Sequence, residues 1–341
     1  MDCNLALQAT CSKTTKEALD KVQSQAVHFI SGGMRSAPTA ACEIHTNIEP
    51  LQMRREAAVV ETVERYKRLS KNHPNRQIVD NWRPQHRLKQ KTILDVALGL
   101  QEKYHMPENR EETQIVHTEV PPNCSLACPK INTTLTKDIT KKSSDPVDLW
   151  MVAQDTILSF PDEWIHVYTD GSAFKGTINA GYGARIEYPD KTCDELQNAC
   201  GKYCSNFEAE TIAIEASVHH LTNIFQLHPE KTQHTVIFTD GKSVLQALES
   251  ANPESSACQS LALSISSFIN TFAVKLTLQW IPGHSNIQGN ERADTLAKAG
   301  ANSQQHDRPI TLQTAKQIIR SNKKEEWMNE WAKQAEPSLN T

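Results

Sequence analysis

Residues 164–172 read WIHVYTDGS, an alternating apolar run that ends at an acidic residue, Asp170. Alternation with a period of two predicts a β-strand over residues 165–169. Residues 235–241 read TVIFTDG and repeat this arrangement, with Asp240 directly after a fully apolar run. A strand that is apolar on both faces is typical of a sheet covered by helices on both sides. These two runs predict an α/β fold in which acidic residues stand where strands end.

The sequence around these two runs predicts the remaining elements of one domain. Further strands are predicted at residues 180–188, 193–203 and 274–281, and helices at residues 206–223, 242–250, 256–272 and 290–301. The resulting order is βββαβααβα. We therefore predict a mixed five-stranded sheet with flanking helices over residues 162–302.

The chain outside this domain divides into three parts. Residues 1–75 show helical periodicity, with helices expected over residues 14–35, after Pro38 and over residues 50–70. Residues 76–161 are polar and contain several prolines, which predicts a linker with little regular structure. Residues 303–341 predict a helical C-terminal tail, in which Trp327 and Trp331 share one face.

The helix expected over residues 50–70 carries basic residues between its apolar positions. These residues are Arg54, Arg55, Arg65, Lys67 and Arg68. Two interpretations stay open at this point. The basic residues form either the solvated face of a helical bundle or a surface that contacts nucleic-acid phosphates.

The composition is that of a moderately polar protein, with 341 residues, 38% hydrophobic residues and a net charge of −4. No apolar run approaches the roughly 20 residues of a membrane helix, and the N-terminus lacks the pattern of a secretory signal. We expect an intracellular protein, in the nucleus or the cytoplasm, that is not secreted and has no membrane partner. Residues 162–302 carry 9 Lys and Arg against 16 Asp and Glu, so this part cannot rely on broad electrostatic attraction to nucleic acid.

Four acidic residues lie where the predicted elements begin or end: Asp170, Glu210, Asp240 and Asp294. Asp170 and Asp240 follow strands, and if those strands are neighbours their carboxylates lie side by side at the carboxyl edge of the sheet. Glu210 and Asp294 lie in the first turns of helices and can reach the same edge. Repulsion within such a cluster predicts raised pKa values and binding of divalent cations. Hard oxygen ligands favour Mg²⁺ or Mn²⁺ over Zn²⁺.

Five short motifs in this order resemble the ribonuclease H family. They are DGS at 170–172, GYG at 181–183, AE at 209–210, TD at 239–240, and WIPGH at 280–284 followed by GNERAD at 289–294. The resemblance covers residues 162–302 and is strongest to the ribonuclease H attached to reverse transcriptases of non-LTR retrotransposons, the LINE or jockey-like elements. Residues 14–70 also resemble the segment that follows the reverse-transcriptase palm. The chain thus resembles the C-terminal fragment of such a polyprotein.

This resemblance implies an endoribonuclease that hydrolyses the RNA strand of RNA–DNA hybrids and leaves 5'-phosphate and 3'-hydroxyl ends. It implies two Mg²⁺ ions per site, with Mn²⁺ as a substitute. By the same resemblance Asp170 bridges both ions, and Glu210 and Asp240 complete the ligands on one side. Asp294 completes the other side, and His284 assists proton movement or product release.

The substrate implied by the resemblance is an RNA–DNA hybrid, with the reverse-transcriptase module of the same element as a partner. Predicted substrate contacts are Asn206, one helical turn before Glu210, together with Ser172 and Asn290. Because the chemistry must ignore base sequence, these contacts should reach 2'-hydroxyls and the backbone. Glu208, although close to Glu210, is predicted to be a solvated surface charge.

Two departures from the family pattern and two alternatives accompany this interpretation. Gly241 stands where a serine is usual, and residues 249–260 contain no Lys or Arg, so the basic substrate-gripping extension of some bacterial relatives is missing. One alternative is a catalytically inactive nucleic-acid-binding remnant of a retrotransposon, which the four intact carboxylates disfavour. The other is a DNA-cutting integrase or resolvase of the same fold superfamily. The run from His284 to Asn290, followed by Asp294, disfavours this second alternative.

Overall fold

The computed structural model describes residues 4–84, 91–112, 128–137, 145–250 and 255–335. The chain forms two compact units, each of which is described here by itself. The first unit joins Met1–Val116 to Pro309–Thr341, and the second is His117–Arg308. Within the described ranges, no helix combines the length and the apolar character needed to cross a membrane.

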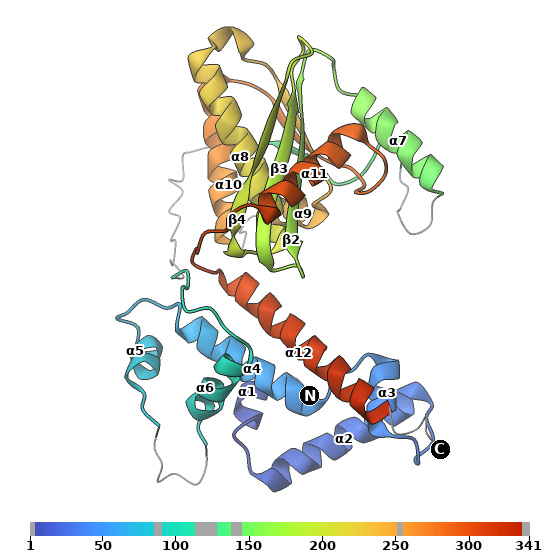
Figure 1. Ribbon diagram of the computed structural model, residues 1–341, viewed down its shortest axis with the longest axis vertical. Coiled ribbons are helices and arrows are strands. Elements are labelled where there is room, and N and C mark those ends of the chain that lie inside the picture. Colours follow the sequence, from blue (N-terminus) through green and yellow to red (C-terminus); the bar gives the residue numbers. More distant parts are fainter. Residues whose placement is uncertain (1–3, 85–90, 113–127, 138–144, 251–254, 336–341) are drawn as a thin grey trace. The chain divides into compact units, whose positions relative to one another are not determined.

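The second unit is built on a six-stranded sheet with the order β1-β6-β5-β2-β3-β4, of which Figure 1 labels β2, β3 and β4. The strands are β1 (Lys130–Asn132), β2 (Ile165–Phe174), β3 (Ile178–Glu187), β4 (Cys193–Tyr203), β5 (Thr235–Thr239) and β6 (Leu276–Trp280). Strands β1, β6, β5 and β2 pair in parallel, whereas β2, β3 and β4 pair antiparallel. The predicted mixed α/β sheet is confirmed, with one strand more than the five expected.

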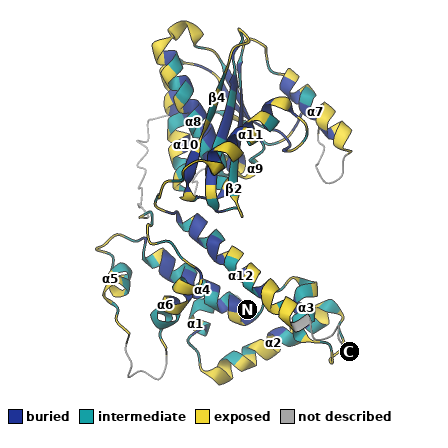
Figure 2. Ribbon diagram, in the orientation of Figure 1, coloured by how far each residue is buried: buried dark blue, intermediate teal, exposed yellow. Residues whose placement is uncertain are grey.

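Helices cover both faces of this sheet, and Figure 1 shows α8 and α10 on one face and α11 on the other. The helices are α7 (Pro146–Leu158), α8 (Asn206–Leu227), α9 (Lys242–Glu249), α10 (Ser256–Phe272) and α11 (Gln288–Asn302). Val167 of β2 faces the core beneath α8 and α10. The next residue, Tyr168, faces the core beneath α7 and α11, where its ring stacks on Phe238 at 5.0 Å between centroids. Figure 2 shows the strands between these layers as largely buried.

The neighbours of β2 decide where its acidic residue emerges. Parallel pairing of β2 with β5 ends at Thr169, which lies opposite Thr239. Antiparallel pairing with β3 continues, and Asp170 lies opposite Gly183. The prediction that this strand ends before Asp170 is therefore wrong, because the ladder with β3 extends β2 to Phe174. Asp170 is the first residue beyond the carboxyl edge that β2 shares with β5.

The stretch predicted to be a linker, residues 76–161, contains more regular structure than expected. Strand β1 pairs with β6, and the Asn132 side chain donates to Gln279 Oε1 at 2.9 Å. Helix α7 begins at Pro146 beneath an Asp145 cap and buries an apolar face in the core. The linker prediction is wrong for these segments. The prolines suggested irregular chain, but proline is well tolerated in the first turn of a helix, and β1 is too short to show periodicity.

The first unit is helical, and its central helix is α4. The helices are α1 (Leu5–Gln8), α2 (Lys13–Ser31), α3 (Thr39–Thr46), α4 (Leu51–Tyr66), α5 (Pro74–Asn81), α6 (Ile93–Lys103) and α12 (Leu312–Ala335). The helices expected over residues 14–35, after Pro38 and over residues 50–70 are confirmed. Ile319 of α12 belongs to the core formed by α4 and α6. The C-terminal tail, expected as a separate part, is thus built into this unit.

Two basic residues of α4 and its end are buried in ion pairs instead of facing solvent or phosphate. Arg55 donates to Asp20 Oδ1 at 2.8 Å, and Arg68 donates to Glu64 Oε2 at 2.6 Å. Arg110 donates to the same oxygen at 2.9 Å. Burial alone would raise the pKa of Glu64, but the two guanidinium groups lower it below its usual value. Neither interpretation of the basic residues therefore holds for Arg55 and Arg68.

We expect Gly183→Ala to destabilise the second unit by about 1–3 kcal/mol. An added Cβ would overlap the backbone oxygen of Ala293 and the backbone nitrogen of Ala297, so β3 and α11 would have to separate. Urea unfolding followed by circular dichroism measures the change. The control is Gly99→Ala in α6, where nothing lies within 4 Å of an added Cβ and a neutral or stabilising effect is expected. An unchanged midpoint for Gly183→Ala would contradict this close packing.

Candidate active site

Three carboxylates come together at the edge where β2 leaves β5. Asp170 belongs to β2, Glu210 to α8, and Asp240 follows β5. Each offers a side-chain oxygen within 4.8 Å of the other two, a grouping that could hold a metal ion. The sheet positions two of the three groups because β2 and β5 are parallel neighbours, so their chains pass the same edge in the same direction.

The start of α8 positions Glu210. Ser205 caps this helix, and its hydroxyl accepts from the Glu208 N–H at 3.2 Å while the Glu208 carboxylate accepts from the Ser205 N–H at 3.2 Å. At Gly171 of β2, an added Cβ would overlap the backbone nitrogen of Glu210. Strand and helix therefore touch through their backbones. The prediction that Glu208 is a solvated charge is wrong, because the capping box and Arg308, at 3.8 Å, hold it in a buried position.

The loop after β6 lies against Asp240. At Gly283, in the loop after β6, an added Cβ would overlap the Asp240 carboxylate. The residues before and after Asp240 form a further link to the cluster: the Gly241 N–H donates to Thr239 Oγ1 at 3.1 Å, and this hydroxyl donates to Glu210 Oε2 at 3.4 Å. The glycine at position 283 is required because any side chain would occupy the space of the carboxylate.

The cluster carries negative charge in a partly desolvated place. Burial is the largest cause that raises the pKa of Asp170, to about 7, followed by the charges of Asp240 and Asp294. Burial, with the charges of Asp170 and Asp240, also raises the pKa of Glu210 well above its ordinary value. Crowded carboxylates with hard oxygen donors fit a divalent cation such as Mg²⁺.

Asp294 belongs to a second group next to this cluster. Its carboxylate lies with His284 and Glu291, whose candidate ligand atoms are all within 4.8 Å of one another. It is also close enough to Asp170 for the two carboxyls to interact. Helix α11 begins at Gln288, earlier than predicted, so Asp294 lies in the second turn and not the first. The structure thus brings all four predicted carboxylates to one region, in two adjoining groups.

Sequence reasoning missed two residues beside Asp294. Glu291 precedes it by three positions, and Lys298 follows it by four, so that all three share one face of α11. The Lys298 ammonium donates to Asp294 Oδ2 at 2.6 Å. The helical spacing was the available signal for both.

The three predicted substrate contacts lie in different surroundings. Ser172 is partly buried, two residues after Asp170 on the same face of β2, and Asn206 is exposed at the first position of α8. Asn290 is only 3% exposed, and its Oδ1 has no hydrogen-bond partner among the described residues. At Gly289, next to Asn290, an added Cβ would overlap the Tyr168 ring, so the start of α11 packs closely against β2. Their contact with substrate stays a prediction.

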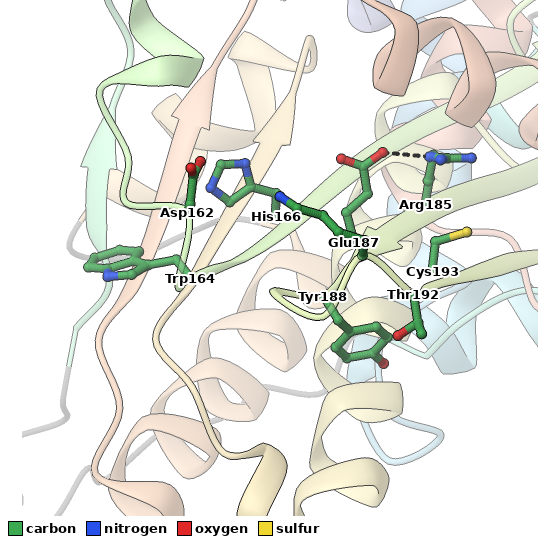
Figure 3. Close-up of a pocket in the computed structure, with 9 residues that line it drawn as sticks. Asp162, Trp164, His166, Arg185, Glu187, Tyr188, Thr192 and Cys193 are labelled. Carbon is green, nitrogen blue, oxygen red and sulfur yellow. Dashed lines mark hydrogen bonds and ion pairs between the residues drawn. The ribbon is translucent and has the colours of Figure 1, made fainter.

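A pocket of about 230 Å³ lies at the opposite end of the strands (Figure 3). His166, Arg185 and Tyr188 line it among others, and Arg185 donates to Glu187 at 2.7 Å. His166 precedes Asp170 by four residues on β2, which corresponds to about 13 Å along a strand. The pocket contains none of the predicted site residues and is not part of the carboxylate site.

Comparison with known proteins assigns the part of the chain that contains the carboxylates. The RNase H family model matches residues 162–302. This segment is a ribonuclease H domain. A curated ribonuclease H from Idiomarina loihiensis is 28% identical to the chain over 149 residues, which is 40% of this chain and 87% of the relative. These two matches confirm the predicted enzyme class, a ribonuclease H hydrolase.

Solved structures similar to the ribonuclease H domain include two ribonucleases H1. One is from the halophilic archaeon Halobacterium salinarum, with 19% identity, a TM-score of 0.33 and coverage of 40% of this chain and 96% of that chain. The other is LC11-RNase H1 in complex with an RNA/DNA hybrid, with 17% identity, a TM-score of 0.33 and coverage of 40% and 97%.

The raised pKa of Asp170 predicts that the metal-free ribonuclease H domain loses stability as the pH rises. The folded pKa of about 7 lies above the ordinary 3.8, so the folded state binds more protons between these values. The contribution of Asp170 to folding stability is present below about pH 4 and is lost as the pH rises through about 7. Asp170→Asn should therefore stabilise the metal-free protein by roughly 1–3 kcal/mol more at pH 7.5 than at pH 5.

Urea unfolding in the presence of a chelator, at both pH values, measures this difference. Asp162→Asn makes the same chemical change at an exposed position just before β2, and it should alter stability equally at both pH values. If Asp170→Asn also gave equal changes at the two pH values, the raised pKa would be refuted.

Proposed function

We propose that this chain is an endoribonuclease that cleaves the RNA strand of RNA–DNA hybrids and leaves 5'-phosphate and 3'-hydroxyl ends. The observation that carries the proposal is the cluster of Asp170, Glu210 and Asp240, with Asp294 beside it, inside the segment that the RNase H family matches. The raised pKa values of Asp170 and Glu210 indicate that the cluster lacks the positive charge it would need at neutral pH. A phosphodiesterase that uses divalent cations requires such a site.

Asp170, Glu210 and Asp240 would hold one Mg²⁺, and Asp170 with Asp294 would hold a second. When bound, such a pair of ions lowers the pKa of an attacking water and stabilises the leaving 3'-oxygen. Asp170 is suited to be a ligand of both ions, because it lies in the first cluster and also interacts with Asp294. Mn²⁺ fits the same oxygen ligands.

The proposed contributions of the other residues concern protons and substrate. His284 is exposed, in the loop between β6 and α11, and lies next to Asp294. It is therefore placed to receive or release a proton at the solvent side of the site. Ser172 and Asn206 flank the carboxylates and would contact the backbone and 2'-hydroxyls of the hybrid. Asn290 would join them only after a local rearrangement at the start of α11.

We also propose that the chain derives from a non-LTR retrotransposon polyprotein and works with the reverse-transcriptase module of the same element. The motif order in residues 162–302 and the resemblance of residues 14–70 to the segment after the palm support this origin. An inactive nucleic-acid-binding remnant is the alternative. The close placement of the carboxylates disfavours it, because a cluster with no catalytic use would be relieved by loss of any one charge.

The test of activity is cleavage of a labelled RNA–DNA hybrid by the full chain with Mg²⁺, beside duplex DNA and duplex RNA. We expect cleavage of the RNA strand of the hybrid alone, and a loss of about 100-fold or more in Asp170→Asn, because a ligand of both ions is removed. Asp162→Asn should retain wild-type activity. Equal activity in Asp170→Asn would refute the proposal, and cleavage of all three substrates would refute its specificity.

Mg²⁺ alone should stabilise the folded protein without any substrate. At a concentration 100 times the dissociation constant, a ligand that binds only the folded state adds about 2.7 kcal/mol. Thermal unfolding with and without Mg²⁺ measures the gain, which should vanish in Asp170→Asn and persist in Asp162→Asn. A wild-type protein that is indifferent to both Mg²⁺ and Mn²⁺ would argue against a metal site at these carboxylates.

A further inference from the structure

Lys298 places a positive group directly on Asp294, one of the proposed metal-binding carboxylates. It lies one helical turn after Asp294 on α11, and its Nζ donates to Asp294 Oδ2 at 2.6 Å. The two side chains differ in exposure, with 57% for Lys298 and 15% for Asp294. The ammonium group therefore reaches from solvent onto a carboxylate that is largely covered.

Of the two basic residues closest to Asp294 on α11, Lys298 is the one that pairs with it. Arg292, two residues before Asp294, is directed elsewhere and forms an ion pair with Glu195 at 2.6 Å. Besides its hydrogen bond to Asp294, Lys298 interacts electrostatically with Asp170 and Glu291. Its charge therefore acts on the region that joins the two carboxylate groups, where a second divalent ion would bind.

We propose that Lys298 is a positioning residue that holds Asp294 as an internal counter-cation and competes with the second divalent ion for it. This inference rests on the proposed function. A divalent cation at Asp294 and an ammonium group hydrogen-bonded to the same carboxylate repel each other. The lysine must therefore move away when the ion binds.

The exposure of Lys298 makes this displacement easy. An ion pair at the surface is weak, because water solvates both groups and the long side chain loses rotamer freedom to form it. The pair orients Asp294 in the metal-free protein, yet it opens readily. Lys298 thus raises the metal concentration at which the second ion binds and leaves the first ion, at Asp170, Glu210 and Asp240, largely unaffected.

Calorimetric titration of the full chain with Mg²⁺ and, separately, Mn²⁺ tests this role without substrate. In Lys298→Met the weaker of the two binding events should become about two- to fivefold tighter, the range expected when a competing surface ion pair is removed. The tighter event should change by less than about twofold. Lys298→Arg, which keeps the charge, should resemble the wild type. Arg292→Met removes one positive charge from the same helix and should leave both events unchanged. Circular dichroism establishes that each variant is folded.

Two kinds of failure can be told apart. If the wild type binds neither Mg²⁺ nor Mn²⁺, the proposed function fails together with this inference. The same holds if Asp170→Asn binds these metals as tightly as the wild type does. If the wild type binds ions through Asp170 but Lys298→Met binds the weaker ion equally or less tightly, only the role of Lys298 is overturned. An equal gain in Arg292→Met would also overturn it, because the effect would then be one of overall charge.

Discussion

Mutual repulsion among desolvated carboxylates is the constraint on which this site depends. Asp170, Glu210 and Asp240 each offer an oxygen within 4.8 Å of the other two, and burial, followed by the charges of Asp240 and Asp294, raises the pKa of Asp170 to about 7. An isolated chain would separate such groups. The fold keeps them together because each is attached to an element that is fixed by the core, and the resulting deficit of positive charge is what makes the cluster suitable for divalent cations.

Direct backbone contact provides the rigidity that this repulsion requires. Gly171 lets β2 touch the start of α8, Gly183 lets β3 touch α11, and Gly283 lets the loop after β6 lie on Asp240. Each glycine stands where a side chain would push a carboxylate-bearing element away. Small residues at these three places thus set the separation of the carboxylates, which long side chains between the layers could not hold as closely.

Outside the ribonuclease H domain, the structure assigns a structural role to two of the basic residues in the helix predicted over residues 50–70. Arg68 is not a nucleic-acid contact but a buried partner of Glu64, which Arg110 also neutralises. The same Arg68 donates to the backbone oxygens of Ile310 and Thr311, at the start of the C-terminal segment. Arg68, which follows α4, therefore connects the N-terminal helices to the C-terminal segment within one unit.

The order of elements in residues 162–302 and the four acidic positions could be predicted from the sequence, because periodicity and short motifs are local properties. The sequence also predicted that Asp170 and Asp240 would be neighbours, since parallel strands present their carboxyl ends at one edge. It could not predict that β1 joins the sheet, because its partner β6 is far away in the chain. The continuation of β2 past Asp170 follows from its hairpin with β3, and the burial of Glu208 follows in part from the local capping box with Ser205, a signal that sequence reasoning missed. The grouping of Asp294 with His284 and Glu291, and its ion pair with the Lys298 ammonium, became visible only in the folded chain. The physical reason is that the packing of α11 against β3 fixes which face of the helix meets the site, and the charge of that face decides what the carboxylates can bind.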